Sequence, residues 1–171
     1  MRSDVTLHPL DRARLQDLLH AAVEDADPLE VMPPVPGPGG WTTERRSAFV
    51  RFHESRSLSA HPVETTFVIA VSGRVVGAAR LCPVEDRDGT VEAGVWIGRS
   101  HRGTGVGSAV LELLLDRARA SGCDEVYVST TPQNSAVRAL MAAHSEGARG
   151  RSALVAAELA YRHASLALAA A

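Results

Sequence analysis

The sequence predicts one domain of mixed α/β class, in which helices flank a central, mostly antiparallel sheet. Apolar residues recur at helical spacing near the start of the chain, and three apolar runs separated by short turns follow between residues 67 and 97. A strand, a glycine-rich turn, a helix and another strand then succeed one another over residues 91–129. With 171 residues the chain is long enough for one hydrophobic core and too short for two. We therefore expect residues 1–171 to form a single domain.

The first elements are a short strand over residues 5–7 and a helix over residues 10–25. Asp11 and Arg12 open the helix, and Asp27-Pro28 ends it, because the residue before a proline disfavours helical geometry. The apolar positions that predict the helix are Leu15, Leu18, Leu19 and Val23.

The segment Pro28–Gly40 is expected to be a loop. It contains five prolines and three glycines in thirteen residues, a composition that excludes a regular element. A second helix follows, capped by Thr42 or Thr43 and ending near Ser57, with Phe49, Phe52 and Ala48 on its apolar face.

Three strands in antiparallel succession come next, over residues 67–71, 75–81 and 91–97. The turn sequences Ser72-Gly73-Arg74 and Asp86-Arg87-Asp88-Gly89 separate them. A helix over residues 108–121 buries Val106, Ala109, Val110, Leu113 and Leu114, and it is followed by a strand over residues 125–129 and a helix over residues 131–143. A helical crossover makes the strand at 125–129 parallel to its partner.

The turn Arg102-Gly103-Thr104-Gly105-Val106-Gly107 is the most informative stretch. Glycines that open a helix leave unpaired amides at the positive end of the helix dipole, where an anion can approach without meeting a Cβ. The dinucleotide-binding spacing G-x-G-x-x-G is not met, and a P-loop needs a lysine, which this chain lacks. The turn therefore predicts a site for the phosphates of some other cofactor.

The spacing Arg102-x-x-Gly105-x-Gly107 resembles the acetyl-CoA pyrophosphate loop of the GNAT superfamily of N-acetyltransferases. Asn134, Val137 and Leu140 match a second family motif, N-x-x-[AV]-x-x-L. The resemblance implies a sheet of six to seven strands, acetyl-CoA as cosubstrate and a homodimer. It also implies a final strand, placed at Tyr161–Ala169. The cofactor-binding residues that it implies are Val95, Trp96, Ile97, Arg102, Gly103, Thr104, Gly105, Val106, Gly107, Ser108 and Asn134.

Amide formation by direct acetyl transfer needs a base for the amine and a proton donor for the leaving thiolate. Glu92, inside the strand before the glycine turn, is the first candidate for the base, although strand alternation alone would also put a glutamate there. Family members often carry a tyrosine where this chain has Met141. The acid is then Tyr127, Ser135, His144, Tyr161 or water, or catalysis is weak and the protein only binds the cofactor. We take Tyr127 as the candidate.

Acceptor recognition is expected from the first half of the chain. Asp27 and Glu30, with Glu24 and Asp25 nearby, would favour a cationic amine such as an aminoglycoside or a polyamine. The acidic turn Glu85-Asp86-Asp88 offers a second such surface, and both could equally be solvated charge runs. Trp41, with Phe49, Phe52 and His53, could instead line a pocket for an amino acid or a peptide N-terminus, or belong to the core.

Composition narrows the remaining classes. The formal net charge of −2 argues against a nucleic-acid partner, and the absence of a long apolar run argues against a membrane span. Cys82 and Cys123 are expected to be reduced core residues of a cytoplasmic protein, and the scattered histidines predict no metal site. The sequence thus predicts an N-acetyltransferase for a small primary amine. The alternatives are an acetyltransferase for amino acids or protein N-termini and an acyl-CoA-binding module.

Overall fold

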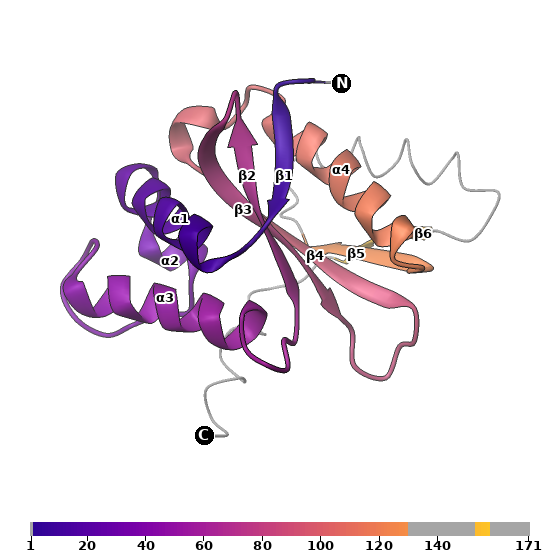
Figure 1. Ribbon diagram of the computed structural model, residues 1–171, viewed down its shortest axis with the longest axis horizontal. Helices are drawn as coiled ribbons and strands as arrows, with labels where there is room; N and C mark the ends of the chain where they lie inside the picture. The colour runs from indigo at the N-terminus through magenta and orange to yellow at the C-terminus, as the bar shows by residue number, and fades with distance from the viewer. Residues whose placement is uncertain (1, 130–152, 158–171) are drawn as a thin grey trace.

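A six-stranded sheet in the order β1-β2-β3-β4-β5-β6 forms the centre of the protein (Figure 1). The computed structural model describes residues 2–129 and 153–157. Neighbouring strands from β1 to β4 are antiparallel, whereas β4–β5 and β5–β6 are parallel. The predicted mixed, mostly antiparallel sheet is confirmed. The strands are β1 (Val5–Pro9), β2 (Thr65–Val71), β3 (Arg74–Pro83), β4 (Thr90–Ile97), β5 (Glu125–Ser129) and β6 (Ala153–Ala157).

The antiparallel part of the sheet depends on two turns that need left-handed backbone. Ser72 and Gly73, with φ of 49° and 82°, connect β2 to β3 as a two-residue hairpin loop, in agreement with the predicted turn. Asp86 and Gly89, with φ of 61° and 74°, reverse the chain between β3 and β4. The resulting register of β3 and β4 pairs Cys82 with Glu92.

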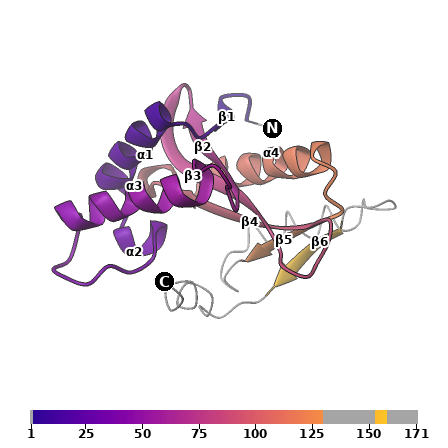
Figure 2. The same cartoon turned by 60° about the horizontal axis from the view of Figure 1, so that its bottom comes forward.

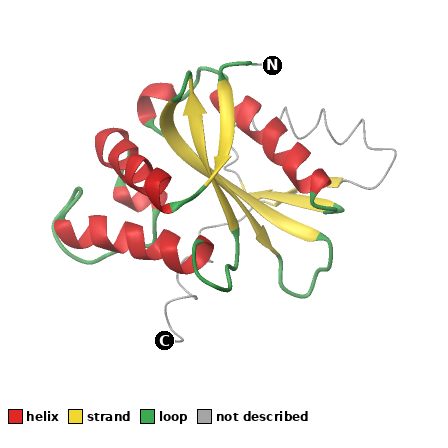
Figure 3. Ribbon diagram, viewed as in Figure 1, coloured by secondary structure: helices red, strands yellow, loops and turns green. Residues whose placement is uncertain are grey.

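Helices cover both faces of the sheet (Figures 2 and 3). On one face α1 (Arg12–Asp25) and α3 (Thr43–Ser57) enclose a core that includes Leu18, Phe49 and Val68. On the other face α4 (Val106–Ala120) buries Val106, Ala109, Val110, Leu111, Leu114, Leu115 and Ala118 against the strands. Leu113, expected in that core, is only partly buried, and Leu111 and Leu115 are buried in addition.

The two predicted helices of the first half are present with the predicted caps. Asp11 Oδ1 accepts a hydrogen bond of 2.8 Å from the Arg14 amide at the start of α1. Thr42 Oγ1 accepts one of 3.3 Å from the Arg45 amide at the start of α3. Each cap satisfies a first-turn amide that has no partner within the helix.

The expectation that Pro28–Gly40 contains no regular element is wrong at its start. A short helix, α2, occupies Pro28–Val31. Asp27 caps it by accepting from the Leu29 amide at 2.9 Å, and Pro28 takes the first helical position, where its missing N–H costs nothing. A high proline content predicts a loop because proline breaks a helix from within, but proline is tolerated in the first turn of a helix.

The buried side chain of Arg45 holds the rest of the proline-rich segment in place. Its side chain is buried, with the residue 6% exposed, and the guanidinium donates to backbone carbonyls along the loop. The contacts include Nη2 to Val35 O at 2.9 Å and Nη1 to Gly40 O at 2.7 Å. Gly37 O and Pro38 O accept from the same group. One buried arginine therefore supplies donors that this loop lacks in its own backbone.

The last part of the chain is described only at β6, which lies parallel to β5. The predicted helix over residues 131–143 and the predicted strand Tyr161–Ala169 lie outside the described residues.

Replacing Arg45 by methionine should destabilise the protein by about 2–3 kcal/mol, because it leaves several loop carbonyls without their donor. Arg46→Met is the matched control, since Arg46 is the exposed neighbour on the same helix. Urea denaturation of both variants measures the difference, and equal midpoints for the two would contradict the assigned role of Arg45.

Candidate active site

The glycine turn puts the start of α4 just beyond the end of β4. Gly103 and Gly105 have φ of 71° and 84°, a conformation that residues with a side chain rarely adopt. Gly105 occupies the N-cap position of α4, and no side chain caps this helix. Its first-turn amides have no partner within the helix and lie at the positive end of its dipole. The turn therefore has the donors and the open backbone that an anion site requires.

The remaining predicted cofactor residues of the turn lie close to β4. A Cβ on Gly107 would stand 3.6 Å from Ile97 Cδ1, so the helix start is in contact distance of the strand end. The Thr104 hydroxyl donates to His101 O at 2.7 Å and helps to shape the turn. Ser108 is half-buried in the first turn of α4.

Beyond Ala93, β4 has one edge without a strand partner among the described residues. β4 pairs with β3 from Val91 to Ile97, but with β5 only from Thr90 to Ala93. Within the described residues, the pairing of β4 with β5 thus ends before the predicted residues Val95, Trp96 and Ile97. The backbone there has the hydrogen-bonding groups that an extended ligand could pair with.

Asp25 fixes the segment between β4 and the glycine turn. Both of its carboxylate oxygens accept from the Ser100 amide at 3.1 Å, and Oδ2 accepts from Ser100 Oγ at 2.5 Å. A Cβ on Gly98 would clash with Asp25 Oδ2, so a larger residue there would force the carboxylate to shift. The Ser100 hydrogen bonds, with a weaker contribution from His101, lower the pKa of Asp25 against the effect of burial.

Asp27 and Glu30, predicted to bind the acceptor, instead contact arginines that flank the cofactor turn. Arg102 Nη2 lies 2.7 Å from Glu30 Oε2, and its Nε donates to Ile97 O at 2.8 Å. Arg99 lies 3.6 Å from Asp27 and 3.8 Å from Glu30. The hydrogen bond from Arg102 lowers the pKa of Glu30. Together with Asp25, these carboxylates form what we call the acidic corner.

Arg2 reaches the glycine turn from the start of the chain. Its Nη1 donates to Thr104 O at 2.8 Å and to Thr104 Oγ1 at 3.2 Å, and Asp4 holds the same guanidinium at 2.7 Å. Its Cδ lies 3.7 Å from the position that a Cβ on Gly105 would take. Sequence reasoning missed this cation because nothing local connects residues 2 and 104.

Glu92 and Tyr127, the candidate base and acid, are brought together. They are register partners on β4 and β5, just before the pairing of those strands ends within the described residues. Arg87 from the β3–β4 turn donates to the Tyr127 hydroxyl at 2.6 Å and lies over its ring. Because an arginine only donates, the hydroxyl keeps its own proton available.

Arg80 orients the Glu92 carboxylate. Its Nη2 donates to Glu92 Oε1 at 3.2 Å, while the Glu92 side chain stays 40% exposed. Arg80 lies across Gly94, where a Cβ would come within 2.7 Å of its Nε. The sequence signal that could have identified Arg80 is its position as an arginine within a largely apolar run.

The guanidinium of Arg80 is anchored on its other side by a buried carboxylate. The Glu64 side chain is fully buried and lies 2.8 Å from Arg56 and 3.3 Å from Arg80. These two arginines offset the charge of Glu64, which would otherwise be costly to bury. The chain of ion pairs Arg56–Glu64–Arg80–Glu92 therefore links α3 to the candidate base.

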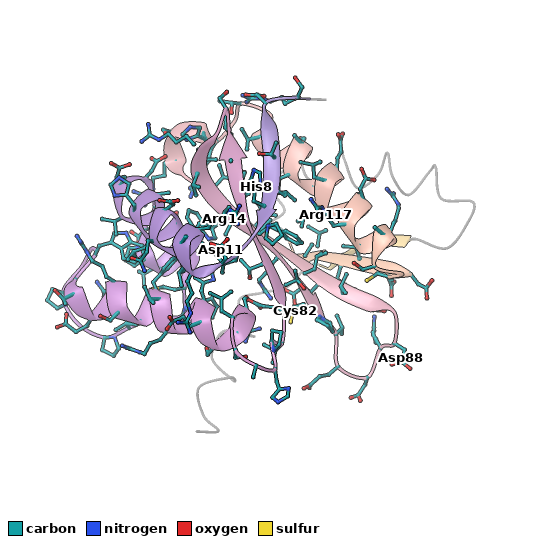
Figure 4. All side chains as sticks on the ribbon, in the orientation of Figure 1. His8, Asp11, Arg14, Cys82, Asp88 and Arg117 are labelled. Carbon is teal, nitrogen blue, oxygen red and sulfur yellow. The ribbon has the colours of Figure 1, made fainter. Side chains whose placement is uncertain are left out.

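The other predicted residues fall into separate groups. Trp41 packs edge-on against Phe49 at 5.7 Å and donates its indole N–H to Ala26 O at 2.9 Å, so it belongs to the core beside α3. Asn134 lies outside the described residues. Asp88 marks the acidic β3–β4 turn, at the opposite end of β4 from the glycine turn (Figure 4).

The comparison with known families identifies the class of protein. Residues 27–144 match the family described as acetyltransferase (GNAT) family, which is more than half of the chain. This chain therefore belongs to the GNAT acetyltransferase family. It is accordingly an acetyl-CoA-dependent N-acyltransferase, the class that the glycine turn indicates.

Solved structures of this fold resemble the chain at low sequence identity. The spermidine/spermine N-acetyltransferase SpeG from Vibrio cholerae is 16% identical, with a TM-score of 0.58 over 82% of this chain and 78% of that chain. RimJ from Mycobacterium smegmatis, in complex with CoA-disulfide, is 23% identical, with a TM-score of 0.63 over 81% and 68%. The ribosomal-protein-S18-alanine N-acetyltransferase from Escherichia coli is 16% identical, with a TM-score of 0.54 over 82% and 76%. At these identities the likeness establishes the fold.

Three further observations concern the residues that the structure describes. None of the helices in residues 2–129 has the length and apolar character needed to cross a membrane. No group of three or more histidine, cysteine or acidic side chains in this part is arranged to hold a metal ion. Cys82 and Cys123 are free thiols, as predicted, and both are half-buried rather than fully in the core.

The acidic corner should make folding sensitive to acid. Folding lowers the pKa of Asp25 below its ordinary value of about 3.9, chiefly through the hydrogen bond from the Ser100 hydroxyl. Its ionised form therefore stabilises the fold above that pH, and the contribution is lost as the pH falls through the folded pKa. Asp25→Asn should lower stability at pH 7 by about 1 kcal/mol and flatten the loss below pH 4, measured as thermal midpoints from pH 7 to 3. Asp17→Asn, on the exposed face of α1, is the control, and parallel pH profiles for wild type and Asp25→Asn would contradict the role of Asp25.

Proposed function

We propose that this protein transfers the acetyl group of acetyl-CoA directly to a primary amine of a small molecule. The observation that carries the proposal is the position of the uncapped start of α4 beside the free edge of β4. The first offers donors to phosphates, and the second offers a backbone edge to an extended pantetheine chain.

The cofactor contacts we propose divide between these two features. Backbone amides from Gly103 to Ser108 bind the pyrophosphate, and the backbone of Val95, Trp96 and Ile97 pairs with the pantetheine arm. Arg2 and Arg102 are the nearest cations to the turn, and both hold hydrogen bonds to its backbone or to the end of β4. We propose that Asn134 contacts the pantetheine arm as well.

For the chemistry, we propose Glu92 as the base and Tyr127 as the acid. Glu92, half-exposed beside Arg80, accepts a proton from the acceptor ammonium through a water molecule. The free amine then forms the new N–C bond as the C–S bond breaks, and Tyr127 gives its proton to the departing thiolate. The second proton, which the nitrogen loses as the amide forms, passes through water to Tyr127 and restores its hydroxyl. Arg87, which donates to the Tyr127 hydroxyl, stabilises the phenolate that this step leaves.

The acceptor approaches from the face that carries α3, since Glu92, Arg80 and Trp96 lie on that face. Similar structures are named for spermidine and for an alanine of a ribosomal protein, so a polyamine, an aminoglycoside or a peptide N-terminus are all candidates. Asp27 and Glu30 already pair with Arg99 and Arg102. We therefore propose that they position the cofactor turn and act on the acceptor only by their long-range charge.

Assembly and location follow the family resemblance and the composition. We propose a homodimer in the cytoplasm, where the free thiols of Cys82 and Cys123 would stay reduced.

A change of Gly105 to glutamate should abolish CoA binding, because its carboxylate would occupy the anion position in front of α4. Gly122→Glu is a matched control: it adds the same charge at a glycine of similar φ, 78°, at the other end of the helix. Calorimetric titration with CoA should show binding to wild type and Gly122→Glu only. Unchanged affinity in Gly105→Glu would reject the assigned cofactor site.

Glu92→Gln should reduce kcat/KM for the amine about a hundredfold or more while leaving CoA affinity unchanged, because it removes the base but no cofactor contact. Glu85→Gln, in the exposed β3–β4 turn, is the control. Thiol release from acetyl-CoA is followed across a panel of amines. A wild type that binds CoA tightly but releases none with any amine would favour an acyl-CoA-binding module.

A further inference from the structure

Three buried nitrogen atoms between α3 and the sheet have no hydrogen-bond partner among the described residues. They are His53 Nδ1, His53 Nε2 and Trp96 Nε1. His53 is only 4% exposed, and burial lowers its pKa to about 4, so the imidazole is neutral at physiological pH. Neither side chain takes part in the proposed cofactor site or proton transfers.

These nitrogens require a specific set of hydrogen-bond partners. A neutral imidazole has one donor and one acceptor, and an indole has one donor. Leaving a buried polar group unpaired destabilises a protein, so such groups in native proteins usually meet a water molecule or a ligand. The complement of two donors and one acceptor is a group with an oxygen that accepts and a hydrogen that donates.

Both rings lie on the acceptor side of the sheet and share one neighbour. The Phe49 ring is 4.6 Å from the His53 ring and 6.5 Å from the Trp96 ring, both edge-on. Trp96 is on the same face of β4 as Glu92, because the two are four residues apart in a strand. His53 lies near Glu64, whose carboxylate connects through Arg80 to Glu92. Phe49 therefore lies next to both rings, and both rings lie on the face of the sheet that carries Glu92.

An oxygen satisfies these nitrogens better than an ammonium group does. An ammonium only donates, so it would pair with the imidazole acceptor and leave both donors without a partner. Two carboxylates on this face already have partners, since Glu64 pairs with Arg56 and Arg80, and Glu92 with Arg80. Arginines thus balance the charges of Glu64 and Glu92, which makes them weaker partners for a plain polyamine.

We propose that His53 and Trp96 form an acceptor subsite that binds a hydroxyl or carbonyl oxygen close to the reacting amine. The subsite rests on the proposed acetyl transfer and defines its acceptor as an oxygen-bearing amine. Two sources share this chemistry: an amino sugar, with a hydroxyl beside the amine, and an amino acid amide, with a carbonyl beside it.

The first test compares KM values for matched acceptors in wild type, His53→Phe and Trp96→Phe. Glucosamine and alaninamide represent the two sources, and butylamine lacks the oxygen. Each variant should raise KM about tenfold for whichever oxygen-bearing acceptor is used, a factor worth 1.4 kcal/mol. His53→Phe, which changes no proposed cofactor contact, should leave KM for butylamine and acetyl-CoA unchanged. The melting temperature should stay constant or rise, because each variant removes a buried unpaired nitrogen. Unchanged KM values with raised melting temperatures would overturn the proposal and leave these nitrogens as structural features only.

A second measurement does not depend on turnover. The chain has two tryptophans, and Trp41 provides an internal control because its indole N–H already donates to Ala26 O. In ¹⁵N-labelled protein, saturating glucosamine or alaninamide should shift the Trp96 indole resonance and leave the Trp41 resonance in place. Butylamine should shift neither.

The two failures are separable. Wild-type protein that releases no CoA with any amine refutes the proposed acetyl transfer, and the Trp96 resonance still reports on the subsite. Active protein in which neither oxygen-bearing probe moves that resonance refutes the subsite alone.

Discussion

The site depends on an imbalance in the pairing of β4. The strand is paired along almost its whole length with β3, but within the described residues it pairs with β5 only as far as Ala93. An unpaired strand edge presents backbone N–H and C=O groups with which an extended ligand can pair. The chain then passes through a short 3₁₀ helix, Arg99–His101, and the glycine turn into α4, so the strand edge and the uncapped helix start adjoin. Every proposed cofactor contact in the described residues except Arg2 belongs to this strand-turn-helix unit.

The carboxylates around the glycine turn have specific partners, which composition alone does not reveal. The acidic corner places carboxylates next to a site that we propose for an anion, which would be unfavourable if they were unpaired. Arg99 and Arg102 pair with Asp27 and Glu30, and the Asp25 carboxylate accepts a hydrogen bond from the Ser100 hydroxyl. The corner thus contributes rigidity to the segment before the turn, and its negative charge is largely balanced by the two arginines.

The sequence predicted the elements well because periodicity, caps and turn residues are local signals. The spacing of the glycines, the cap at Thr42 and the hairpin at Gly73 each act within a few residues. Local sequence patterns do not indicate which side chains contact one another in the folded protein. The contact of Arg2 with Thr104 and that of Asp25 with Ser100 join residues far apart in the chain, so only the folded structure reveals them. For the same reason the sequence predicts Asp27 and Glu30 as acceptor-binding residues without indicating their arginine partners, which come about seventy residues later in the chain.

Glu92 shows how the fold turns an ordinary strand residue into a candidate base. Alternation along β4 gives it a half-exposed position, which is equally typical of a solvent-facing glutamate. The distinction comes from Gly94, two residues further on the same face, which leaves room for Arg80 to lie along the strand and reach the carboxylate. The buried Glu64 holds the other side of that guanidinium, so if Arg80 turned away, the buried carboxylate would lose one of its two arginine partners. Glu92 is also the register partner of Tyr127 on β5, whose hydroxyl accepts a hydrogen bond from Arg87, so the two residues that we propose for proton transfer lie on neighbouring strands.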